Sequence, residues 1–311
     1  MNFYKLQGAG NDFIIINNIK EKIPEEKIPG IAGRICTRKL SLGADGLLLI
    51  EAARHGGGGG GGVAAAVAVR VFNADGSESE MCGNGMRCVA RYVFEEGLAP
   101  KEAEAGGRIV IETMAGDIEA LRLSRRRFRI RLQDPSVLEE GRSITVQGRT
   151  YRYTYVELGN PGIPHIVLDG IPWKDPSGTG EDFSPDTLRE LARTLRFHPD
   201  FPKGTNVNFC RVREDNGVDL LTYERGVEDF TLACGTGAGS AALALKCRGA
   251  AGGERVSLFA PGGLLLVEVV RKEDGGYGLF LTGDTNFVAR GEILDDDLYI
   301  IGKEEESCSR K

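Results

Sequence analysis

Two cysteines in this chain share one local pattern, in which Cys is followed by Gly, a polar residue and a second Gly. Cys82 precedes Gly83, Asn84 and Gly85, and Cys234 precedes residues 235–237, Gly-Thr-Gly. Apolar and small residues follow in both places, and each such segment ends near a glycine. The pattern predicts that each of the two cysteines lies at the N-terminus of a helix.

A thiol at a helix N-terminus meets backbone N–H groups and the positive end of the helix dipole. It is therefore more acidic than the reference pKa of about 8.5, and the same amides can bind an anion. Inverting a stereocentre needs a base on one face of the carbon and an acid on the other. One thiolate and one thiol meet that need in both directions, and a carboxylate held by the amides becomes more electron-rich as the proton leaves. Such chemistry requires neither a metal nor pyridoxal.

An approximate duplication indicates how the two cysteines are positioned. Three landmarks occur in the same order in each half: a Gly-Asn pair before an apolar strand, an Asn-containing turn, and the Cys-Gly-x-Gly segment. They are Gly10-Asn11, 73–76 and 81–85 in the first half, and Gly159-Asn160, 204–206 and 233–237 in the second. We therefore expect two related halves that each present one Cys to a shared cleft.

The predicted fold class is α/β (α+β), with two pseudo-symmetric halves at 1–134 and 135–283, each a mixed sheet wrapped around the helix after its Cys. The connection is expected near 133–136, where Pro135 ends the preceding strand. A helix is expected at 28–40, and the run of glycines at 56–62 predicts a flexible hairpin loop. The tail 302–311 is polar. Further strands are predicted at 13–16, 46–50, 108–113, 118–123, 150–158, 206–213, 218–223, 256–259, 264–270 and 277–282.

The composition of the 311 residues excludes several classes of protein. Hydrophobic residues make up 41% and charged residues 27%, which is typical of a folded chain. The formal net charge of −6 argues against a nucleic-acid surface, and the basic run at 125–131 alternates with apolar residues as a strand with one solvated face does. We find no stretch of membrane-spanning length and no signal-peptide pattern, so we expect a cytoplasmic protein with no membrane partner.

The other cysteines and the histidines give no metal or disulfide signature. The 7 cysteines are an odd number spread along a long chain, without a Cys-x-x-Cys pair, and the 3 histidines stand apart. A disulfide framework and a structural zinc site are therefore not expected. We interpret the remaining cysteines of the folded part as small apolar residues; they are Cys36, Cys88, Cys210 and Cys247.

With these motifs in place, the sequence resembles the diaminopimelate epimerase family. The matching segments are GAGNDF at 8–13, FNADGS at 72–77, MCGNG at 81–85, GTNVN at 204–208, YERG at 223–226 and LACGTGA at 232–238. They extend from residue 8 to residue 238 and together are highly specific.

The resemblance implies cofactor-independent epimerisation of LL-2,6-diaminopimelate to the meso isomer, in lysine and peptidoglycan precursor biosynthesis, by a homodimer. It assigns the acid/base roles to Cys82 and Cys234 and places a strand at about 284–301 back in the first half. The residues implied to hold the reacting carboxylate are Gly83, Asn84, Gly235 and Thr236. Those implied to bind the rest of the substrate are Asn11, Asn73, Asn160, Asn206, Glu224 and Arg225. Those implied to tune the thiols are His165 and Glu224.

Three positions depart from the family pattern. Residues 162–164 stand between Asn160-Pro161 and His165, Gly46 replaces a common Gln, and the Gly/Ala tract at 56–66 replaces an amphipathic hairpin. The nearest alternative is a proline or hydroxyproline racemase, although those enzymes typically read Cys-Gly-His-Gly at the first site. A non-catalytic amino-acid-binding relative and a thiol–disulfide oxidoreductase are the alternatives from other classes.

Overall fold

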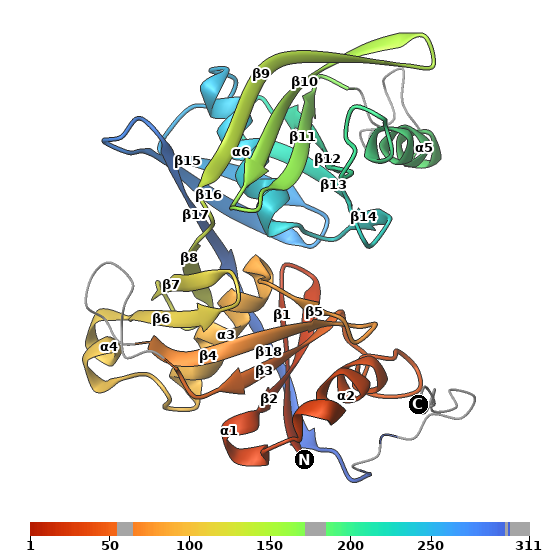
Figure 1. The fold of residues 1–311 in the computed structure, drawn as a ribbon. Coiled ribbons are helices and arrows are strands. Elements are labelled where there is room, and N and C mark those ends of the chain that lie inside the picture. Colours follow the sequence, from red (N-terminus) through yellow and green to blue (C-terminus); the bar gives the residue numbers. More distant parts are fainter. Residues whose placement is uncertain (55–64, 172–184, 296–297, 299–311) are drawn as a thin grey trace. The chain divides into compact units, whose positions relative to one another are not determined.

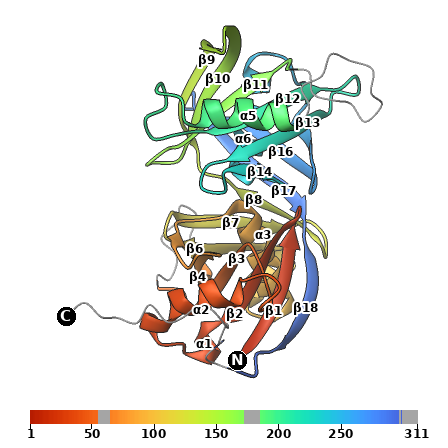
Figure 2. The same cartoon turned by 90° about the vertical axis from the view of Figure 1, so that its right-hand side faces the viewer.

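The computed structural model describes residues 1–54, 65–171, 185–295 and 298. Within it the chain forms two compact units: unit 1 comprises Met1–Arg126 and Thr285–Lys311, and unit 2 comprises Arg127–Asp284. Both units combine a mixed sheet with a few helices (Figures 1 and 2), so the predicted α/β class is confirmed. The predicted glycine loop at 56–62 and the predicted polar tail at 302–311 lie outside the described residues.

Unit 1 contains one sheet with the strand order β18-β1-β2-β3-β4-β6-β7, in which β2–β3 and β4–β6 are parallel and the other neighbours antiparallel. The short β5 also pairs with β4. The strands are β1 (Asn2–Gly8), β2 (Asn11–Asn17), β3 (Gly46–Glu51), β4 (Ala65–Asn73), β5 (Glu78–Ser79), β6 (Arg108–Thr113), β7 (Gly116–Arg122) and β18 (Asn286–Glu292). The helices are α1 (Asn18–Glu21), η1 (Glu25–Lys27), α2 (Ile28–Ile35), α3 (Gly83–Glu95) and α4 (Lys101–Gly106).

Unit 2 contains a sheet with the order β9-β10-β11-β12-β13-β15-β16-β17-β8, in which β11–β12 and β13–β15 are parallel. The short β14 pairs with β13. The strands are β8 (Arg127–Arg131), β9 (Pro135–Val146), β10 (Arg149–Leu158), β11 (Ile163–Asp169), β12 (Asn206–Val212), β13 (Val218–Glu224), β14 (Asp229–Thr231), β15 (Arg255–Ala260), β16 (Gly263–Arg271) and β17 (Tyr277–Asp284). The helices are α5 (Pro185–Arg196) and α6 (Gly235–Cys247).

The two sheets repeat the same succession of pairings. From β1 to β7 and from β10 to β16, neighbours pair antiparallel, parallel, antiparallel, parallel and antiparallel. Helix α3 follows β5 as α6 follows β14, and each packs against several strands of its own sheet. Unit 1 and unit 2 therefore have equivalent strands, and a residue of one sheet can be matched to a residue of the other by its register.

Each sheet is covered on both faces. In unit 1, Leu47 and Leu49 of β3 pack with Ile28 and Ile35 of α2, whereas Leu48 between them faces α3. This alternation follows from the period of two along a strand. Helices α3 and α6 are buried over almost their whole length, which explains why α6 consists mainly of small and apolar residues.

Two boundaries differ from the sequence expectation. Strand β8 pairs with β17 and belongs to unit 2, although the expected boundary at 134/135 assigns it to the first half, and Pro135 begins β9. Helix α2 ends at Ile35 rather than near Leu40. The chain turns there through Lys39 at a positive φ of 70°, and backbone bonds from Gly43 to Ile35 and from Ala44 to Cys36 return it to the core.

Candidate active site

Cys82 immediately precedes α3, as the Cys-Gly-x-Gly pattern predicts. Its backbone is extended (φ −135°, ψ 117°) and its carbonyl accepts the N–H of Met86 at 2.8 Å. The side chain is half-buried, while the helix from Gly83 to Val93 is buried. Because the first N–H groups of a helix have no intrahelical partner, they are directed to the region of Cys82.

A chain of polar contacts leads from the sulfur of Cys82 into unit 1 through three further side chains. The Cys82 thiol donates to Oδ1 of Asn11 over 3.7 Å, and Nδ2 of Asn84 donates to the same oxygen over 3.3 Å. Nη2 of Arg87 then donates to Oδ1 of Asn84 over 2.8 Å. Asn84 is 2% exposed and Arg87 is fully buried, so this chain of contacts continues beneath the helix N-terminus.

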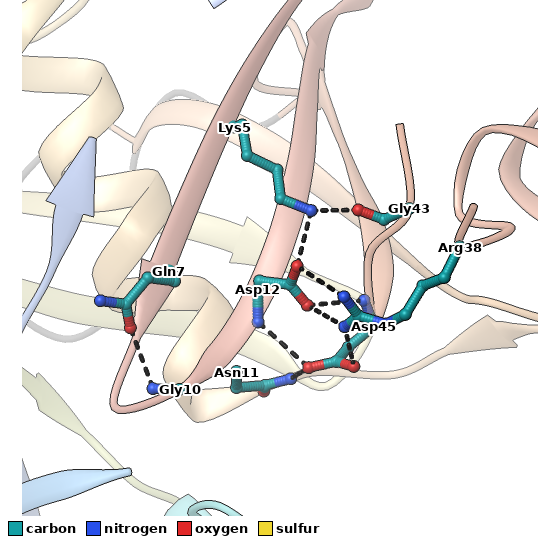
Figure 3. A network of polar contacts seen from close by, with 8 residues as sticks. All are labelled: Lys5, Gln7, Gly10, Asn11, Asp12, Arg38, Gly43 and Asp45. Carbon is teal, nitrogen blue, oxygen red and sulfur yellow. Dashed lines mark hydrogen bonds and ion pairs between the residues drawn. The ribbon is translucent and has the colours of Figure 1, made fainter. Parts of the chain in front are cut away.

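On its other side Asn11 joins a cluster of four charged residues, which we call the charged cluster: Lys5, Asp12, Arg38 and Asp45 (Figure 3). Nδ2 of Asn11 donates to Oδ2 of Asp45 over 2.7 Å. Partial burial disfavours the charged form of Asp12, but hydrogen bonds from Lys5 and Arg38 outweigh it and hold the pKa of that carboxyl below its usual value. The charged cluster therefore fixes the side of Asn11 that faces away from Cys82.

Asn73 ends β4 opposite Gly46 of β3 and is exposed. Its Nδ2 donates to Oγ of Ser77 over 2.9 Å within the turn that follows the strand. A Cβ atom at Gly46 would lie 2.6 Å from the carbonyl oxygen of Phe72. The backbone at Gly46 thus leaves no room for a larger side chain such as Gln.

Cys234 precedes α6 in unit 2 with a similar extended backbone (φ −114°, ψ 119°), and it is 5% exposed. The sulfur accepts the backbone N–H of Gly237 over 3.4 Å and lies 3.4 Å from the hydroxyl of Thr236. At Cys234 a backbone N–H therefore donates to the sulfur, whereas the thiol of Cys82 donates to an amide oxygen.

His165 lies on β11 next to Asn206 of the parallel strand β12 and is fully buried. Nδ2 of Asn206 lies 3.4 Å from its Nε2, and Nδ2 of Asn208 lies 3.3 Å from its Nδ1. Burial, reinforced by the positive charge of Arg225, lowers the pKa of His165 to about 3. The ring is therefore neutral at physiological pH.

A buried hydroxyl and an amide connect this histidine to the Cys234 helix. Thr222 on β13 donates to Oδ1 of Asn208 over 2.9 Å. A Cβ atom placed on Gly237 would lie 2.5 Å from that Oδ1, 2.8 Å from Oγ1 of Thr222 and 3.2 Å from Cβ of Cys234. The first turn of α6 thus rests directly on the polar side chains of β12 and β13.

The remaining predicted residues of unit 2 meet where β12 and β13 come together. Oδ1 of Asn206 accepts the backbone N–H of Arg225 over 2.7 Å, and Nη1 of Arg225 donates to the carbonyl of Lys203 over 3.1 Å. Glu224 ends β13, beside Arg225. Asn160 lies exposed in the turn between β10 and β11.

The predicted residues accordingly form one group in each unit. In unit 1 the contacts join Asn11, Cys82 and Asn84, and Asn73 ends a strand of the same sheet. In unit 2 they join His165, Asn206 and Arg225 on one side and Cys234 with Thr236 on the other. Sequence reasoning gave no role to the residues that connect these groups, which are Asp45, Arg87, Asn208 and Thr222. Only Asn208 carried a signal, because it lies two positions after Asn206 and a strand places such residues on one face.

The other cysteines have different surroundings. Cys36, Cys88 and Cys210 are buried, and burial raises the pKa of Cys36 and of Cys88 to about 12 and that of Cys210 further. Cys247 is half-buried and donates to the hydroxyl of Tyr277 over 3.5 Å. In the described part of the chain, no group of three or more His, Cys, Asp or Glu side chains is arranged to hold a metal ion. Among the described helices, none has the length and apolar character needed to cross a membrane.

Comparison with solved structures matches the fold of the chain. A hydroxyproline epimerase from Agrobacterium vitis, solved with bound trans-4-hydroxy-L-proline, superposes with a TM-score of 0.63 at 19% identity, covering 94% of this chain and 91% of that one. A PhzF-family phenazine biosynthesis protein from Bacillus anthracis superposes with a TM-score of 0.66 at 13% identity, covering 95% and 99%. These identities establish a common fold.

Comparison with protein sequences is more specific. The model of the family described as diaminopimelate epimerase matches residues 3–124 and 177–288. The diaminopimelate epimerase of Moorella thermoacetica is 34% identical over 94% of this chain and 99% of its own length, and that of Archaeoglobus fulgidus is 35% identical over 95% and 97%. The chain therefore belongs to the diaminopimelate epimerase family.

Proposed function

We propose that this protein is an isomerase that epimerises LL-2,6-diaminopimelate to meso-diaminopimelate without a cofactor. The observation that carries the proposal is the repeated placement of a Cys directly before a buried helix, Cys82 before α3 and Cys234 before α6. The full-length similarity to diaminopimelate epimerases, on both cysteine segments, supports the same conclusion.

In this proposal one cysteine acts as a thiolate base and the other as a thiol acid on the same α-carbon. The base removes the α-proton, the acid delivers a proton to the opposite face, and the two exchange roles in the reverse direction. The backbone amides that follow each Cys, at Gly83, Asn84, Gly235 and Thr236, hold the reacting carboxylate. Negative charge develops on that carboxylate as the proton leaves, and these donors stabilise it.

The far end of diaminopimelate is chemically complementary to the residues proposed to bind the rest of the substrate. Diaminopimelate carries a distal ammonium and a distal carboxylate, and Glu224 beside Arg225 offers a charged partner to each. The amides of Asn11, Asn73, Asn160 and Asn206 supply neutral donors and acceptors. We propose that Glu224 and His165 tune the acidity of the two thiols. The neutral ring of His165 is connected through Asn208 to Thr222, and α6 rests on both of these residues.

The direct test is incubation of the purified protein with LL-diaminopimelate and separation of the stereoisomers. We expect the meso isomer, and in deuterated water at early times we expect label in the inverted product and not in the recovered substrate. Cys82→Ala and Cys234→Ala each abolish turnover, whereas Cys247→Ala, at a half-buried cysteine of α6, serves as the matched control and keeps it. Turnover of proline or 4-hydroxyproline in place of diaminopimelate would contradict the proposal.

Three broader properties belong to the same proposal. We propose that the enzyme acts in lysine biosynthesis and is a homodimer, as the family resemblance implies, and that it acts in the cytoplasm. Light scattering of the purified protein measures its oligomeric state directly. A monomeric mass at assay concentration would contradict the proposed homodimer.

A further inference from the structure

The two amides beside Cys82 are bounded by groups of opposite charge. Asn11 donates from Nδ2 to the carboxylate of Asp45, and a carboxylate can only accept. Asn84 accepts at Oδ1 from the guanidinium of Arg87, which can only donate. Each amide therefore has one orientation. Oδ1 of Asn11 is the atom left to face both Nδ2 of Asn84 and the sulfur of Cys82.

This fixed orientation gives the sulfur of Cys82 an acceptor. A protonated thiol can donate to Oδ1 of Asn11, whereas a thiolate would meet the lone pairs of that oxygen. At Cys234 the arrangement is opposite, because the backbone N–H of Gly237 points to the sulfur and favours its charged form. The equivalent cysteines of the two units are thus not equivalent in their hydrogen bonding.

From these contacts, and given the proposed function, we infer that Asp45 and Arg87 are positioning residues. They lock the amides of Asn11 and Asn84 and thereby keep Cys82 a thiol in the substrate-free enzyme, whereas the N–H of Gly237 makes Cys234 the thiolate. Because Arg38 bonds to Asp45 over 2.9 Å and also to Asp12, the charged cluster holds the carboxylate of Asp45 in place (Figure 3).

The charged groups around this network lie on different elements of unit 1, and their net effect has to be separated from the orientation of the amides. Arg87 and Arg91 on α3 are positive, as are Lys5 on β1 and Arg38 after α2. Asp12 on β2 and Asp45 before β3 are negative. A substitution at Asp45 changes both the local charge and the amide lock, whereas the same substitution at Asp12 changes the charge of the cluster and leaves the Asn11–Asp45 bond.

The test is the rate of iodoacetamide alkylation at each cysteine across pH, read by peptide mass spectrometry on the substrate-free protein. The midpoint of each pH profile reports ionisation separately from access of the reagent. In the wild type we expect the lower midpoint at Cys234. Asp45→Asn frees the Asn11 amide to turn its Nδ2 to the sulfur, so the midpoint at Cys82 falls by roughly half a unit to one unit, about threefold to tenfold in thiolate. Cys234 does not change.

Two variants control this result. Asp12→Asn removes the same charge from the same cluster and should move the Cys82 midpoint less. Glu21→Gln makes the same change from carboxylate to amide at an exposed Asn2–Glu21 bond elsewhere in unit 1 and should move neither. Circular dichroism establishes that each variant is folded, and Arg87→Lys, which keeps the charge but not the forked donor, should lower the Cys82 midpoint in the same direction as Asp45→Asn.

Three results would overturn the inference: a wild-type midpoint that is lower at Cys82 than at Cys234, no shift in Asp45→Asn, or an equal shift in Asp12→Asn. The alkylation profiles do not depend on whether the protein turns over diaminopimelate. A protein that epimerises diaminopimelate with equal midpoints contradicts only this inference, and one with the expected midpoints but without epimerase activity supports it and contradicts only the proposed function.

Discussion

The two helices that follow the cysteines rest on different layers of side chains, although the strands beneath them are equivalent. Under α3 the row across the sheet is Ile15, Leu48 and Val71, and a Cβ on Gly85 would meet Leu48. Under α6 the equivalent row contains Asn208 and Thr222, and a Cβ on Gly237 would meet both. The repeated backbone therefore does not determine the chemistry around each thiol.

The polar groups that influence each cysteine also lie in different places in the two units. In unit 2 the hydrogen bonds lie inside the sheet, from His165 through Asn208 to Thr222, all buried. In unit 1 the sheet beneath the helix is apolar, and the two orienting charges are Arg87 within α3, which is buried, and Asp45 before β3, which is 43% exposed. Buried polar groups must all be satisfied, so unit 2 tolerates less change than unit 1.

The largest expected effect comes from adding one methyl group beneath each helix. In Gly237→Ala the new Cβ lies 2.5 Å from Oδ1 of Asn208, which is held by its hydrogen bonds, so either the helix or the polar layer must move. We expect at least a 100-fold loss of kcat and about 2–3 kcal/mol of destabilisation.

Gly85→Ala is the matched change in unit 1. Its Cβ lies 3.2 Å from Cδ2 of Leu48, the end of a side chain that can rotate, so we expect about tenfold or less in kcat and roughly 1 kcal/mol in stability. Kinetics and urea unfolding of the two variants measure the contrast, and equal losses in both would contradict the view that the layers differ in tolerance.

The second expected effect is the pH dependence of stability that His165 confers on unit 2. Its folded pKa is about 3, whereas an unfolded His has a pKa of about 6.5, so between these values the unfolded state binds more protons. Stability therefore increases with pH through this window and is lost below 6.5, by up to about 1.4 kcal/mol for each pH unit.

The window from pH 6.5 to 5 isolates this histidine, because most carboxyl groups titrate lower. We expect urea unfolding of the wild type to weaken across it, and the same measurement on His165→Asn, which keeps a neutral polar side chain, to be nearly flat. His198→Asn leaves the buried ring of His165 in place, so it is the control and should keep the wild-type slope. A wild-type stability that is constant from pH 6.5 to 5 would show that His165 can be protonated in the folded state.

Local patterns in the sequence are sufficient to predict the parts of this structure that depend on residues close together in the chain. The Cys-Gly-x-Gly segments predicted both helix N-termini, and the strand at 108–113 was predicted with its observed bounds. Helix α5 also has a local signal, because Leu188, Leu191, Ala192 and Leu195 follow helical spacing and are buried.

Features that depend on distant segments could not be predicted in the same way. Strand β8 belongs to unit 2 because its partner is β17, close to the other end of the chain. The charged cluster brings together Lys5, Asp12, Arg38 and Asp45 from four segments, and each of them alone resembles an ordinary surface charge. The layers beneath the helices depend on strand register, and a sequence pattern does not fix which residue of β12 faces which residue of β13.

The last comparison exchanges a single buried hydroxyl between the two equivalent rows. Thr222→Val keeps the shape of the side chain but removes the donor to Oδ1 of Asn208, so a buried acceptor loses a partner and stability falls by about 1–2 kcal/mol. Val71→Thr is the reverse change at the matched position of unit 1, where Leu48 of the paired strand β3 is apolar, and the desolvated hydroxyl costs a similar amount. Urea unfolding measures both losses of stability.

Because Thr222 supports the residue against which the Cys234 helix rests, only Thr222→Val should also move the midpoint of alkylation at Cys234. Val71→Thr should leave the profiles of both cysteines in place. If neither substitution changed stability, or if Val71→Thr shifted the Cys82 profile as strongly as Thr222→Val shifts that of Cys234, the two layers would not differ in the way that the contacts indicate.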